Sequence, residues 1–247
     1  MQQRLASLAA AGVEYLPTTS PIVFDPIPAP VSVSLFDEVV SPTDVGVDRS
    51  RELAVLAEQV RGCKKCPELF ATRTQTVFGV GPLHPDICFV GEAPGADEDR
   101  LGEPFVGKAG GLLNKMIAAC GLTRDEVYIC NTIKCRPPNN RNPDREECNN
   151  CRPFLDRQLE LVNPKVIVCL GGVAAKNLLN TQSGITKLRG QVYKYNAIPV
   201  ICTYHPSYLL RLEGSGDGER KAKGECWDDL KLALKLVGRE PPAKGSR

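Results

Sequence analysis

The fold is set by Ile87-Cys-Phe-Val90 and the segment after it, Gly91-Glu-Ala-Pro-Gly-Ala-Asp-Glu-Asp-Arg-Leu-Gly-Glu-Pro-Phe-Val-Gly107. The apolar run predicts a buried strand, and Leu112 to Cys120 carry apolar residues at the spacing of one helix face. The long polar connection between them lies where open α/β sheets bind ligands, outside the carboxyl end of a strand. We therefore expect the functional site at this loop.

Three more apolar runs predict strands, at residues 127–130, 166–170 and 198–203. Helical patterns at residues 110–120, 153–162 and 174–179 alternate with the strands, and residues 226–237 predict a closing helix. This alternation indicates an α/β fold, a three-layer α/β/α sandwich around a four-stranded parallel sheet. Each strand is followed by a polar or glycine-rich segment, so four such segments should meet at one edge of the sheet.

The bulk composition is that of an ordinary globular protein, with 42% hydrophobic and 24% charged residues in 247. We expect no membrane span, because no apolar run approaches the ~18 residues that one needs. The start of the chain has no secretory pattern, so we expect a cytoplasmic protein, associated with the nucleoid if its partner is DNA. The net charge of +2 permits a polyanionic partner without demonstrating one.

Three segments organise the chain. Residues 1–47 are proline-rich, and we expect a flexible extension, with a short docking peptide as the alternative. Residues 48–237 form the expected domain and residues 238–247 a disordered tail. The glycine-rich segment 212–224 is expected to be flexible.

Two motifs have competing interpretations. Gly102 to Ala109 nearly match the phosphate-binding loop GxxxxGK[ST], but Ala109 has no hydroxyl for Mg²⁺ and the glycines start well after the strand, so we expect a tight turn that presents Phe105. His205 follows the last strand, and its place at the sheet edge makes a catalytic role as plausible as a structural one.

The sequence has 11 cysteines, which favours metal or cluster ligation for some of them in a reducing compartment. Cys63 and Cys66 form one CxxC pair. Cys148 and Cys151 form another, and Cys135 competes with Cys148 for a place in the site. Either Zn²⁺ or an iron–sulfur cluster accepts four thiolates, and spacing alone leaves both open.

Taken together, four motifs resemble those of the family 4, iron–sulfur uracil-DNA glycosylases over residues 50–237. The motifs are Gly91-Glu-Ala-Pro-Gly95, Pro104-Phe-Val-Gly107, Asn131-Thr-Ile-Lys-Cys-Arg-Pro-Pro138 and His205-Pro-Ser-Tyr-Leu-Leu-Arg211. The resemblance implies the uracil-DNA glycosylase superfamily fold and an enzyme of base-excision repair. Such an enzyme flips uracil out of single- or double-stranded DNA and hydrolyses its N-glycosidic bond, leaving an abasic site.

The resemblance also implies roles for individual residues. Glu92 would position water or support the sugar cation, or else only order the loop, and His205 would stabilise the leaving uracil anion. The base would lie among Ala93, Glu98, Phe105, Asn131 and His205, with Phe105 stacking on it, Asn131 recognising its edge and Glu98 near the position of a thymine methyl group. DNA would contact Lys108, Ser207, Tyr208, Leu209, Leu210 and Arg211, and the apolar members of this set would fill the vacated stack.

The resemblance assigns a [4Fe–4S] cluster to Cys63, Cys66, Cys135 and Cys151, which leaves Cys148 outside the ligand set. We expect a monomer, with the N-terminal extension as a candidate contact for a replication or repair protein. Two alternatives remain on the same scaffold. A covalent uracil-DNA-crosslinking variant is disfavoured by Ala93 and by the absence of an obvious insertion between residues 185–190 and His205, and an idle DNA-binding protein is disfavoured by the retained site residues.

Overall fold

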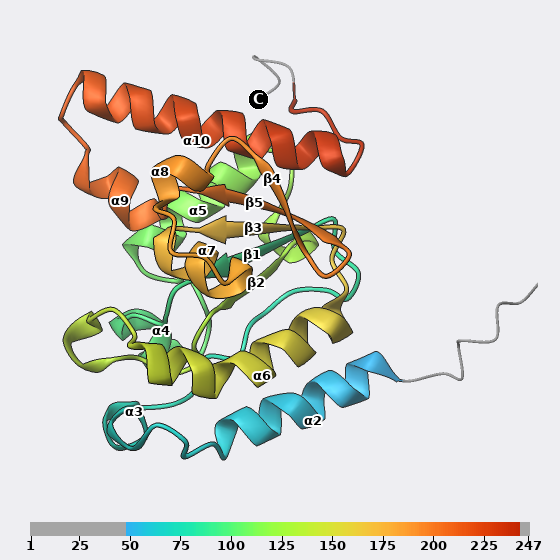
Figure 1. The fold of residues 1–247 in the computed structure, drawn as a ribbon, viewed down its shortest axis with the longest axis vertical. Coiled ribbons are helices and arrows are strands. Elements are labelled where there is room, and N and C mark those ends of the chain that lie inside the picture. The colour runs from blue at the N-terminus through green and yellow to red at the C-terminus, as the bar shows by residue number, and fades with distance from the viewer. Residues whose placement is uncertain (1–47, 243–247) are drawn as a thin grey trace, which may run out of the picture. The chain divides into compact units, whose positions relative to one another are not determined.

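The computed structural model describes residues 48–242, and its core is one sheet with helices on both faces (Figure 1). Five strands lie in the order β2-β1-β3-β5-β4. Their bounds are β1 Ile87–Gly91, β2 Tyr128–Asn131, β3 Val166–Leu170, β4 Val192–Tyr195 and β5 Ile198–Thr203. The first, second, third and fifth strands are parallel, which confirms the predicted sheet, and all their central residues are buried.

Strand β4 was not predicted. β4 pairs antiparallel with β5 at the sheet edge, with Tyr195 opposite Ile198. Its sequence, Val-Tyr-Lys-Tyr, has no continuous apolar run, because an edge strand is half exposed. The β4–β5 hairpin occupies much of the chain between residue 190 and His205.

The helices form the two outer layers. They are α2 Arg49–Arg61, α3 Pro67–Thr72, α4 Ala96–Leu101, α5 Lys108–Ala119, α6 Arg145–Val162, α7 Gly172–Leu179, α8 Ile185–Leu188, α9 Pro206–Arg211 and α10 Asp217–Leu236, with single 3-10 turns at Arg124–Glu126 and Pro138–Asn140. One core joins α5 and α10 to the sheet, and a second core joins α6 and α7 to the opposite face. Helix α2 packs on α6, outside the second layer (Figure 1).

Three helices differ from the predicted bounds. The polar connection after β1 contains a short helix, α4, that ends at Gly102 in a left-handed conformation. Helix α6 starts at Arg145, not near residue 153, because Asp144 and Glu147 form a capping box at its N-terminus. The prediction that segment 212–224 is flexible is wrong from Asp217 onward, because α10 begins there.

The chain ends were predicted to be outside the domain. The extension 1–47 lies outside the described residues, and so does 243–247. The described part of the predicted tail includes Arg239, whose guanidinium forms an ion pair with Asp86 at 2.6 Å. No helix within residues 48–242 is long and apolar enough to cross a membrane.

Candidate functional site

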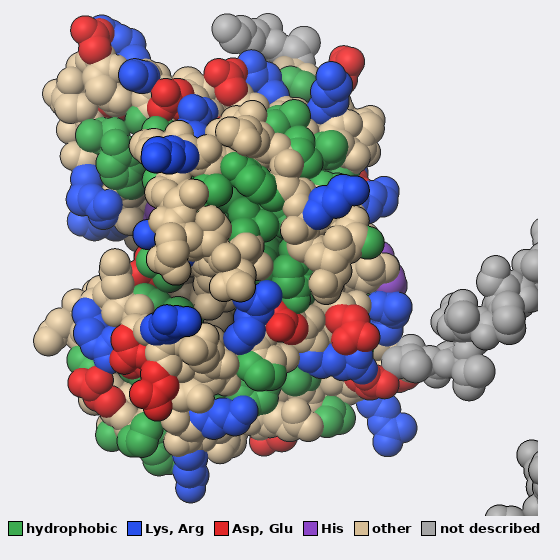
Figure 2. Space-filling view, viewed as in Figure 1, with side chains coloured by type: hydrophobic (Ala, Val, Ile, Leu, Met, Phe, Trp, Pro, Cys, Tyr) green, Lys and Arg blue, Asp and Glu red, His purple; other side chains and the backbone are tan. Residues whose placement is uncertain are grey.

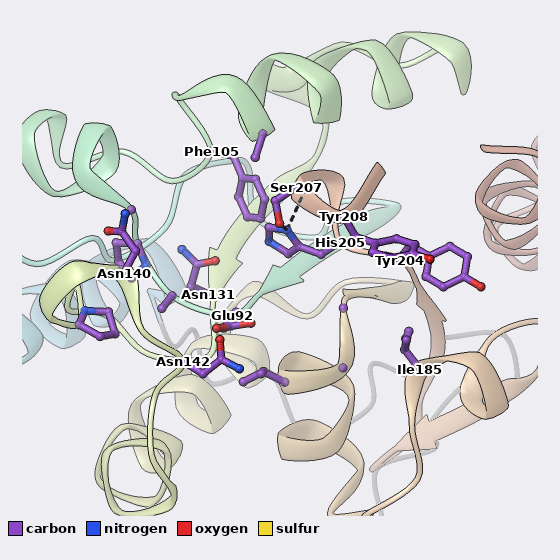
Figure 3. A pocket seen from close by; sticks show the side chains of 18 of the residues that line it. Glu92, Phe105, Asn131, Asn140, Asn142, Ile185, Tyr204, His205, Ser207 and Tyr208 are labelled. Atoms are coloured by element: carbon purple, nitrogen blue, oxygen red, sulfur yellow. Dashed lines mark hydrogen bonds between the residues drawn. The ribbon is translucent and has the colours of Figure 1, made fainter. Parts of the chain in front are cut away.

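A cavity of about 780 Å³ opens at the carboxyl edge of the sheet. The segments after β1, β2, β3 and β5 all contribute to its wall, as the strand order predicts. Figure 3 shows Glu92, Asn131 and His205 reaching the same space from three strand ends, with Phe105 over it. Of the predicted site residues, the structure brings nine to this cavity: Glu92, Ala93, Glu98, Phe105, Asn131, His205, Ser207, Tyr208 and Arg211.

Phe105 forms one wall of the cavity and is held in an unusual backbone conformation. Its φ is +54°, in the left-handed region, and only 5% of the residue is exposed. Its ring lies 5.6 Å from the His205 ring, between centroids. A Cβ at Gly110 would lie 1.9 Å from the Phe105 carbonyl oxygen, so only glycine lets α5 approach this turn. The near match to a phosphate-binding loop is therefore a turn that presents an aromatic ring.

Glu98 fastens this loop closed. Its Oε1 accepts hydrogen bonds from the main-chain N–H groups of Val106 and Gly107, both at 2.9 Å. Its Oε2 accepts from Gly95 N–H at 3.0 Å. Both carboxylate oxygens are thus engaged with the main chain on either side of Phe105, although Glu98 also lines the cavity. The predicted place of Glu98 beside a methyl group stays a prediction.

Asn131 presents an unused acceptor to the cavity. It is the last residue of β2, 2% exposed, and its Oδ1 is buried without a hydrogen-bond partner within residues 48–242. A Cβ at Gly91, its neighbour on β1, would lie 2.4 Å from this oxygen and 2.6 Å from the Phe105 ring. Buried polar atoms are almost always paired, so this oxygen is available for a donor that enters from outside.

His205 is set up as a neutral hydrogen-bond donor. The Ser207 main-chain N–H donates to Nδ1 at 3.1 Å, which makes Nδ1 an acceptor and leaves the ring proton on Nε2. Burial, helped by the charge of Arg211, lowers the pKa of His205 to about 4, against an opposing effect of Glu98. The imidazole is therefore uncharged at neutral pH. It can donate from Nε2 to an oxygen on which negative charge develops.

Glu92 is the second titratable group in the cavity. It follows β1 directly and is partly buried. Burial raises the pKa of its carboxyl group, whereas the Arg211 charge lowers it. A carboxylate whose pKa is shifted by burial in a cleft is a candidate catalytic group. The same position is also compatible with Glu92 only ordering the loop.

The short helix α9 corrects part of the predicted DNA contact. Leu209 is 2% exposed and packs in the core against α5 and α10, so it cannot enter a base stack. Leu210 is partly buried and does not line the cavity. Tyr208 is 37% exposed, its ring lies 5.0 Å from the Tyr204 ring, and Arg211 lies over it at 5.9 Å. Ser207, Tyr208 and Arg211 are therefore the side chains of α9 that reach the cavity and can meet a partner.

Lys108 does not line the cavity. It is the exposed first residue of α5, next to Ala109, which does line it. Sequence reasoning also missed the opposite rim, where Asn140, Arg141 and Asn142 follow the Arg-Pro-Pro segment. The signal was the polar composition of this connection after β2. Figure 2 shows one face of the surface, on which Lys and Arg side chains lie scattered among acidic ones.

Arg141 ties this rim to two helices. Its guanidinium binds both oxygens of Glu147 at 2.7 and 2.8 Å and Glu68 at 2.7 Å. Glu147 is buried at the start of α6, and Glu68 lies at the start of α3. The rim is thereby fixed to α6, which carries the predicted ligand Cys151, and to α3, which begins directly after the predicted ligand Cys66.

The predicted cysteine ligands gather behind the cavity wall. Cys66 ends the loop before α3, Cys135 follows β2, and Cys151 lies on α6. Cys135, Cys148 and Cys151 form a small core to which Cys66 and the cavity residue Ala93 are packed. Burial raises the pKa of Cys135, and Cys63 and Cys66 are near enough to raise it further, against the effect of Arg73.

The donor chemistry around these thiols suits an anionic group. Arg73 donates to the Cys135 sulfur at 2.8 Å, and Asn150 donates to the Cys66 sulfur at 3.7 Å. Within the described part of the chain, no three Cys, His, Asp or Glu side chains form a ready site for a single metal ion. Cys148 is 8% exposed and belongs to the same small core, so its exclusion from the ligand set stays a prediction.

Comparison with known proteins agrees with this geometry. The family model described as the uracil DNA glycosylase superfamily matches residues 78–231. A type-4 uracil-DNA glycosylase of Archaeoglobus fulgidus is 43% identical over 195 residues, which cover 76% of this chain and 94% of the relative. A type-4 uracil-DNA glycosylase of Thermotoga maritima is 47% identical over 165 residues, 66% of this chain and 85% of the relative. A type-5 uracil-DNA glycosylase of Pyrobaculum aerophilum is 31% identical over 182 residues, 60% of this chain and 79% of the relative. The chain therefore belongs to the uracil-DNA glycosylase superfamily and, within it, to the type-4 uracil-DNA glycosylases.

Proposed function

We propose that this protein is a uracil-DNA glycosylase of base-excision repair, which flips uracil out of single- or double-stranded DNA and hydrolyses its N-glycosidic bond. The observation that carries the proposal is the buried Oδ1 of Asn131, which has no hydrogen-bond partner within residues 48–242, in a cavity shared with Phe105 and His205. The flipped base stacks on the Phe105 ring. Unstacking the base costs a few kcal/mol, which the enclosed pocket must offset.

Asn131 selects uracil by its hydrogen-bonding edge. Oδ1 accepts from uracil N3–H, and Nδ2 donates to O4. Cytosine presents an acceptor at N3 and a donor at the 4-position, so both contacts would be mispaired. A buried polar group left unsatisfied costs about 1–3 kcal/mol, which makes this rejection strong.

Ala93 and Glu98 line the part of the cavity that we assign to the side of the base where thymine carries its methyl group. Rejection of thymine is then steric. Glu98 contributes by holding the loop on both sides of Phe105 in place.

His205 stabilises the leaving group. As the N-glycosidic bond breaks, negative charge develops on O2 of uracil, and the neutral Nε2–H donates to it. A preorganised donor of this kind contributes roughly 3–4 kcal/mol to the barrier reduction. Glu92, which lines the same cavity, positions the attacking water or supports the positive charge on the sugar. Its alternative role is to order the loop only.

We place the DNA backbone and the vacated stack along α9 and the start of α5. Tyr208 fills the stack, Arg211 and Lys108 approach phosphates, and Ser207 holds His205 in its tautomer while contacting the strand. The partly exposed Leu210 lies at the margin of this surface. Phosphate contacts of this kind orient the duplex without recognising its sequence.

Cys63, Cys66, Cys135 and Cys151 would hold a [4Fe–4S] cluster. The guanidinium of Arg73 on Cys135 and the packing of Cys66, Cys135 and Cys151 with Ala93 support the assignment. When bound, such a cluster would fasten the loop before α3, the segment after β2 and helix α6 to one another. We further propose a monomer that works on DNA at the nucleoid in the cytoplasm, with residues 1–47 as a contact for a replication or repair protein.

One gel experiment tests the activity. The protein is incubated with a labelled oligonucleotide containing one uracil, treated with alkali and run under denaturing conditions. Strand cleavage at the uracil and free protein are the expected result. An SDS-stable protein–DNA band would indicate the covalent variant instead, and neither product would indicate an idle DNA-binding protein.

Two variants make the test specific. Asn131→Ala removes the proposed base contact and should lower cleavage by at least about tenfold. Asn142→Ala removes an exposed amide from the rim of the same cavity and serves as the matched control. Equal cleavage by both variants would contradict the base-recognition role of Asn131.

A further inference from the structure

Arg124 binds the turn that carries Phe105 from outside the cavity. It begins the 3-10 turn Arg124–Glu126, which leads into β2. Its Nη1 donates to the Phe105 main-chain oxygen at 3.3 Å, and its Nη2 donates to the Pro104 main-chain oxygen at 2.5 Å. The side chain is 21% exposed and does not line the cavity. Any part that Arg124 takes in substrate binding must therefore act through the turn.

The two carbonyl oxygens depend on Arg124 for their hydrogen bonds. Within residues 48–242, neither the Pro104 oxygen nor the Phe105 oxygen accepts from a main-chain N–H. Both residues are buried, and a buried carbonyl group without a donor costs free energy. The turn also holds Phe105 at φ +54°, which few residues other than glycine adopt. The guanidinium thus supplies the donors that this buried, left-handed turn needs.

The other donors of Arg124 fix the guanidinium itself. Nε and Nη2 donate to Glu103 Oε1 at 3.2 and 3.0 Å, and Nη1 also donates to Asn114 Oδ1, on α5, at 3.1 Å. All five N–H donors are therefore engaged inside the protein, and none is left for a DNA phosphate. A guanidinium presents its donors as a rigid planar fork, whereas a lysine ammonium presents three donors at one point. A lysine could not bind both carbonyl oxygens, Glu103 and α5 at once.

The Phe105 turn is held by opposite charges on its two kinds of main-chain group. Glu98 accepts from the two N–H groups that follow Phe105, and Arg124 donates to the carbonyl groups at and before it. Gly110 packs against the same Phe105 carbonyl from α5, where a Cβ would lie 1.9 Å from the oxygen. The main chain on both sides of the ring is therefore tied to charged groups.

We propose that Arg124 is a positioning residue for base binding, because its guanidinium fixes the carbonyl groups at Phe105 and so holds the ring where the flipped uracil stacks. This inference rests on the proposed function, since it acts through the stacking role of Phe105. Without the guanidinium the turn opens more often. A substrate that binds only the closed turn then loses apparent affinity in proportion to the closed fraction, whereas turnover of the bound complex is largely retained.

Four single variants in the full chain test the proposal. Arg124→Met removes the guanidinium, and Arg124→Lys keeps the charge without the planar fork. Glu103→Gln removes the ion pair but leaves the carbonyl contacts. Arg49→Met is the matched control, because Arg49 also donates to two consecutive main-chain oxygens, near the end of α6, and does not line the cavity.

Two measurements are made on each protein after thermal unfolding has shown that it is folded. KM and kcat for uracil excision from a single-stranded oligonucleotide report on base binding and turnover. Chymotrypsin cleavage of the bond between Phe105 and Val106, located by mass spectrometry, reports on opening of the turn and needs no activity.

Arg124→Met should raise KM about tenfold, change kcat by less than about threefold and be cleaved after Phe105 at least about tenfold faster than wild type. Arg124→Lys should recover these values only in part. Glu103→Gln and Arg49→Met should stay within about threefold of wild type, because a half-exposed ion pair contributes little and Arg49 lies elsewhere. In a Phe105→Leu background, Arg124→Met should raise KM by less than about twofold, because the ring that it positions is gone.

The outcomes separate this inference from the proposed function. A wild-type protein that releases no uracil would overturn the proposed function and the base-binding role together, whatever the cleavage shows about the turn. An active wild type, with Arg124→Met equal to Arg49→Met in KM or in cleavage, would overturn the role of Arg124 alone. Equal rises in KM with and without the Phe105 ring would also refute it. If Arg124→Met does not fold, Arg124→Lys decides, since wild-type KM and cleavage in that variant would refute the need for the fork.

Discussion

Removing the Glu98 carboxylate should disable uracil excision by releasing Phe105. Glu98→Ala deletes the acceptor of three main-chain N–H groups, at 3.0, 2.9 and 2.9 Å. Hydrogen bonds to a charged group contribute about 1.5–3 kcal/mol each, and water replaces part of this at a half-buried site. The loop also holds Phe105 at φ +54°, a conformation that costs about 1–2 kcal/mol for a non-glycine residue. In Glu98→Ala the closed loop should therefore lose about 3 kcal/mol of stability relative to the open loop.

Because about 1.4 kcal/mol corresponds to tenfold in rate, kcat/KM for uracil should fall by about 100-fold in Glu98→Ala. Glu98→Gln retains an oxygen for Val106 and Gly107 but places an amide donor opposite the Gly95 N–H, so its loss should be about five- to tenfold. Asp97→Asn is the matched control, because Asp97 is the exposed neighbour whose partner is Arg100 on the surface. Single-turnover excision of uracil and of thymine opposite guanine is measured for all three.

The result that would refute this reasoning is specific. If Glu98→Ala excised uracil at the wild-type rate and gained thymine excision, Glu98 would act on the methyl group directly and not through the loop. If excision of uracil and of thymine both fell, and aromatic fluorescence or limited proteolysis showed an opened loop, the positioning role of Glu98 would stand.

Three further predictions follow from contacts and charges at the cavity. Gly91→Ala should abolish excision and destabilise the domain, because its Cβ would lie 2.4 Å from Asn131 Oδ1. Excision kinetics and thermal unfolding measure both effects. An active, stable variant would contradict the close approach of Gly91 to Asn131. If catalysis requires ionised Glu92, kcat/KM should rise as pH rises through the raised pKa of Glu92. Arg211→Met removes a charge that lowers this pKa, so the acidic limb of the pH profile of kcat/KM should move to higher pH. An unmoved limb would exclude Glu92 as the group that causes it. Tyr208→Ser should weaken excision from duplex DNA more than from single strands, because only a duplex leaves a stack to fill, and equal losses on both substrates would count against that role.

The sheet could be predicted because its four parallel strands are buried on both faces and are therefore continuous apolar runs. Edge strand β4 and the first half of α6 gave no such signal. Val192–Tyr195 is half exposed, and the start of α6 is polar up to Pro153. The start of α6 is instead marked by its capping box, in which Asp144 is the N-cap and Glu147 the third helical residue. Hydrophobic periodicity misses elements whose stability comes from caps or from one-sided pairing.

The meeting of the site residues at one cavity was predictable for a different reason. Parallel strands bring their carboxyl ends together whatever the sequence distance, so Glu92, Asn131 and His205 had to meet once the strands were identified. The direction of each side chain on the short helix α9 was not predictable in this way. Leu209 and Tyr208 are adjacent in sequence, but the helical rotation between them buries the first and exposes the second.

The shape of the cavity depends on glycines as much as on the polar and aromatic side chains that line it. Gly91 leaves room between the Asn131 oxygen and the Phe105 ring, and Gly110 lets the Phe105 carbonyl pack against α5, where a Cβ would lie 1.9 Å away. By contrast, a Cβ at Gly111 would meet nothing within 4 Å. Glycine is thus required at Gly91 on β1 and at Gly110 on α5, but dispensable at the adjacent Gly111. Composition could not distinguish them, because the requirement arises only when β1, β2 and the Phe105 turn close on the same volume.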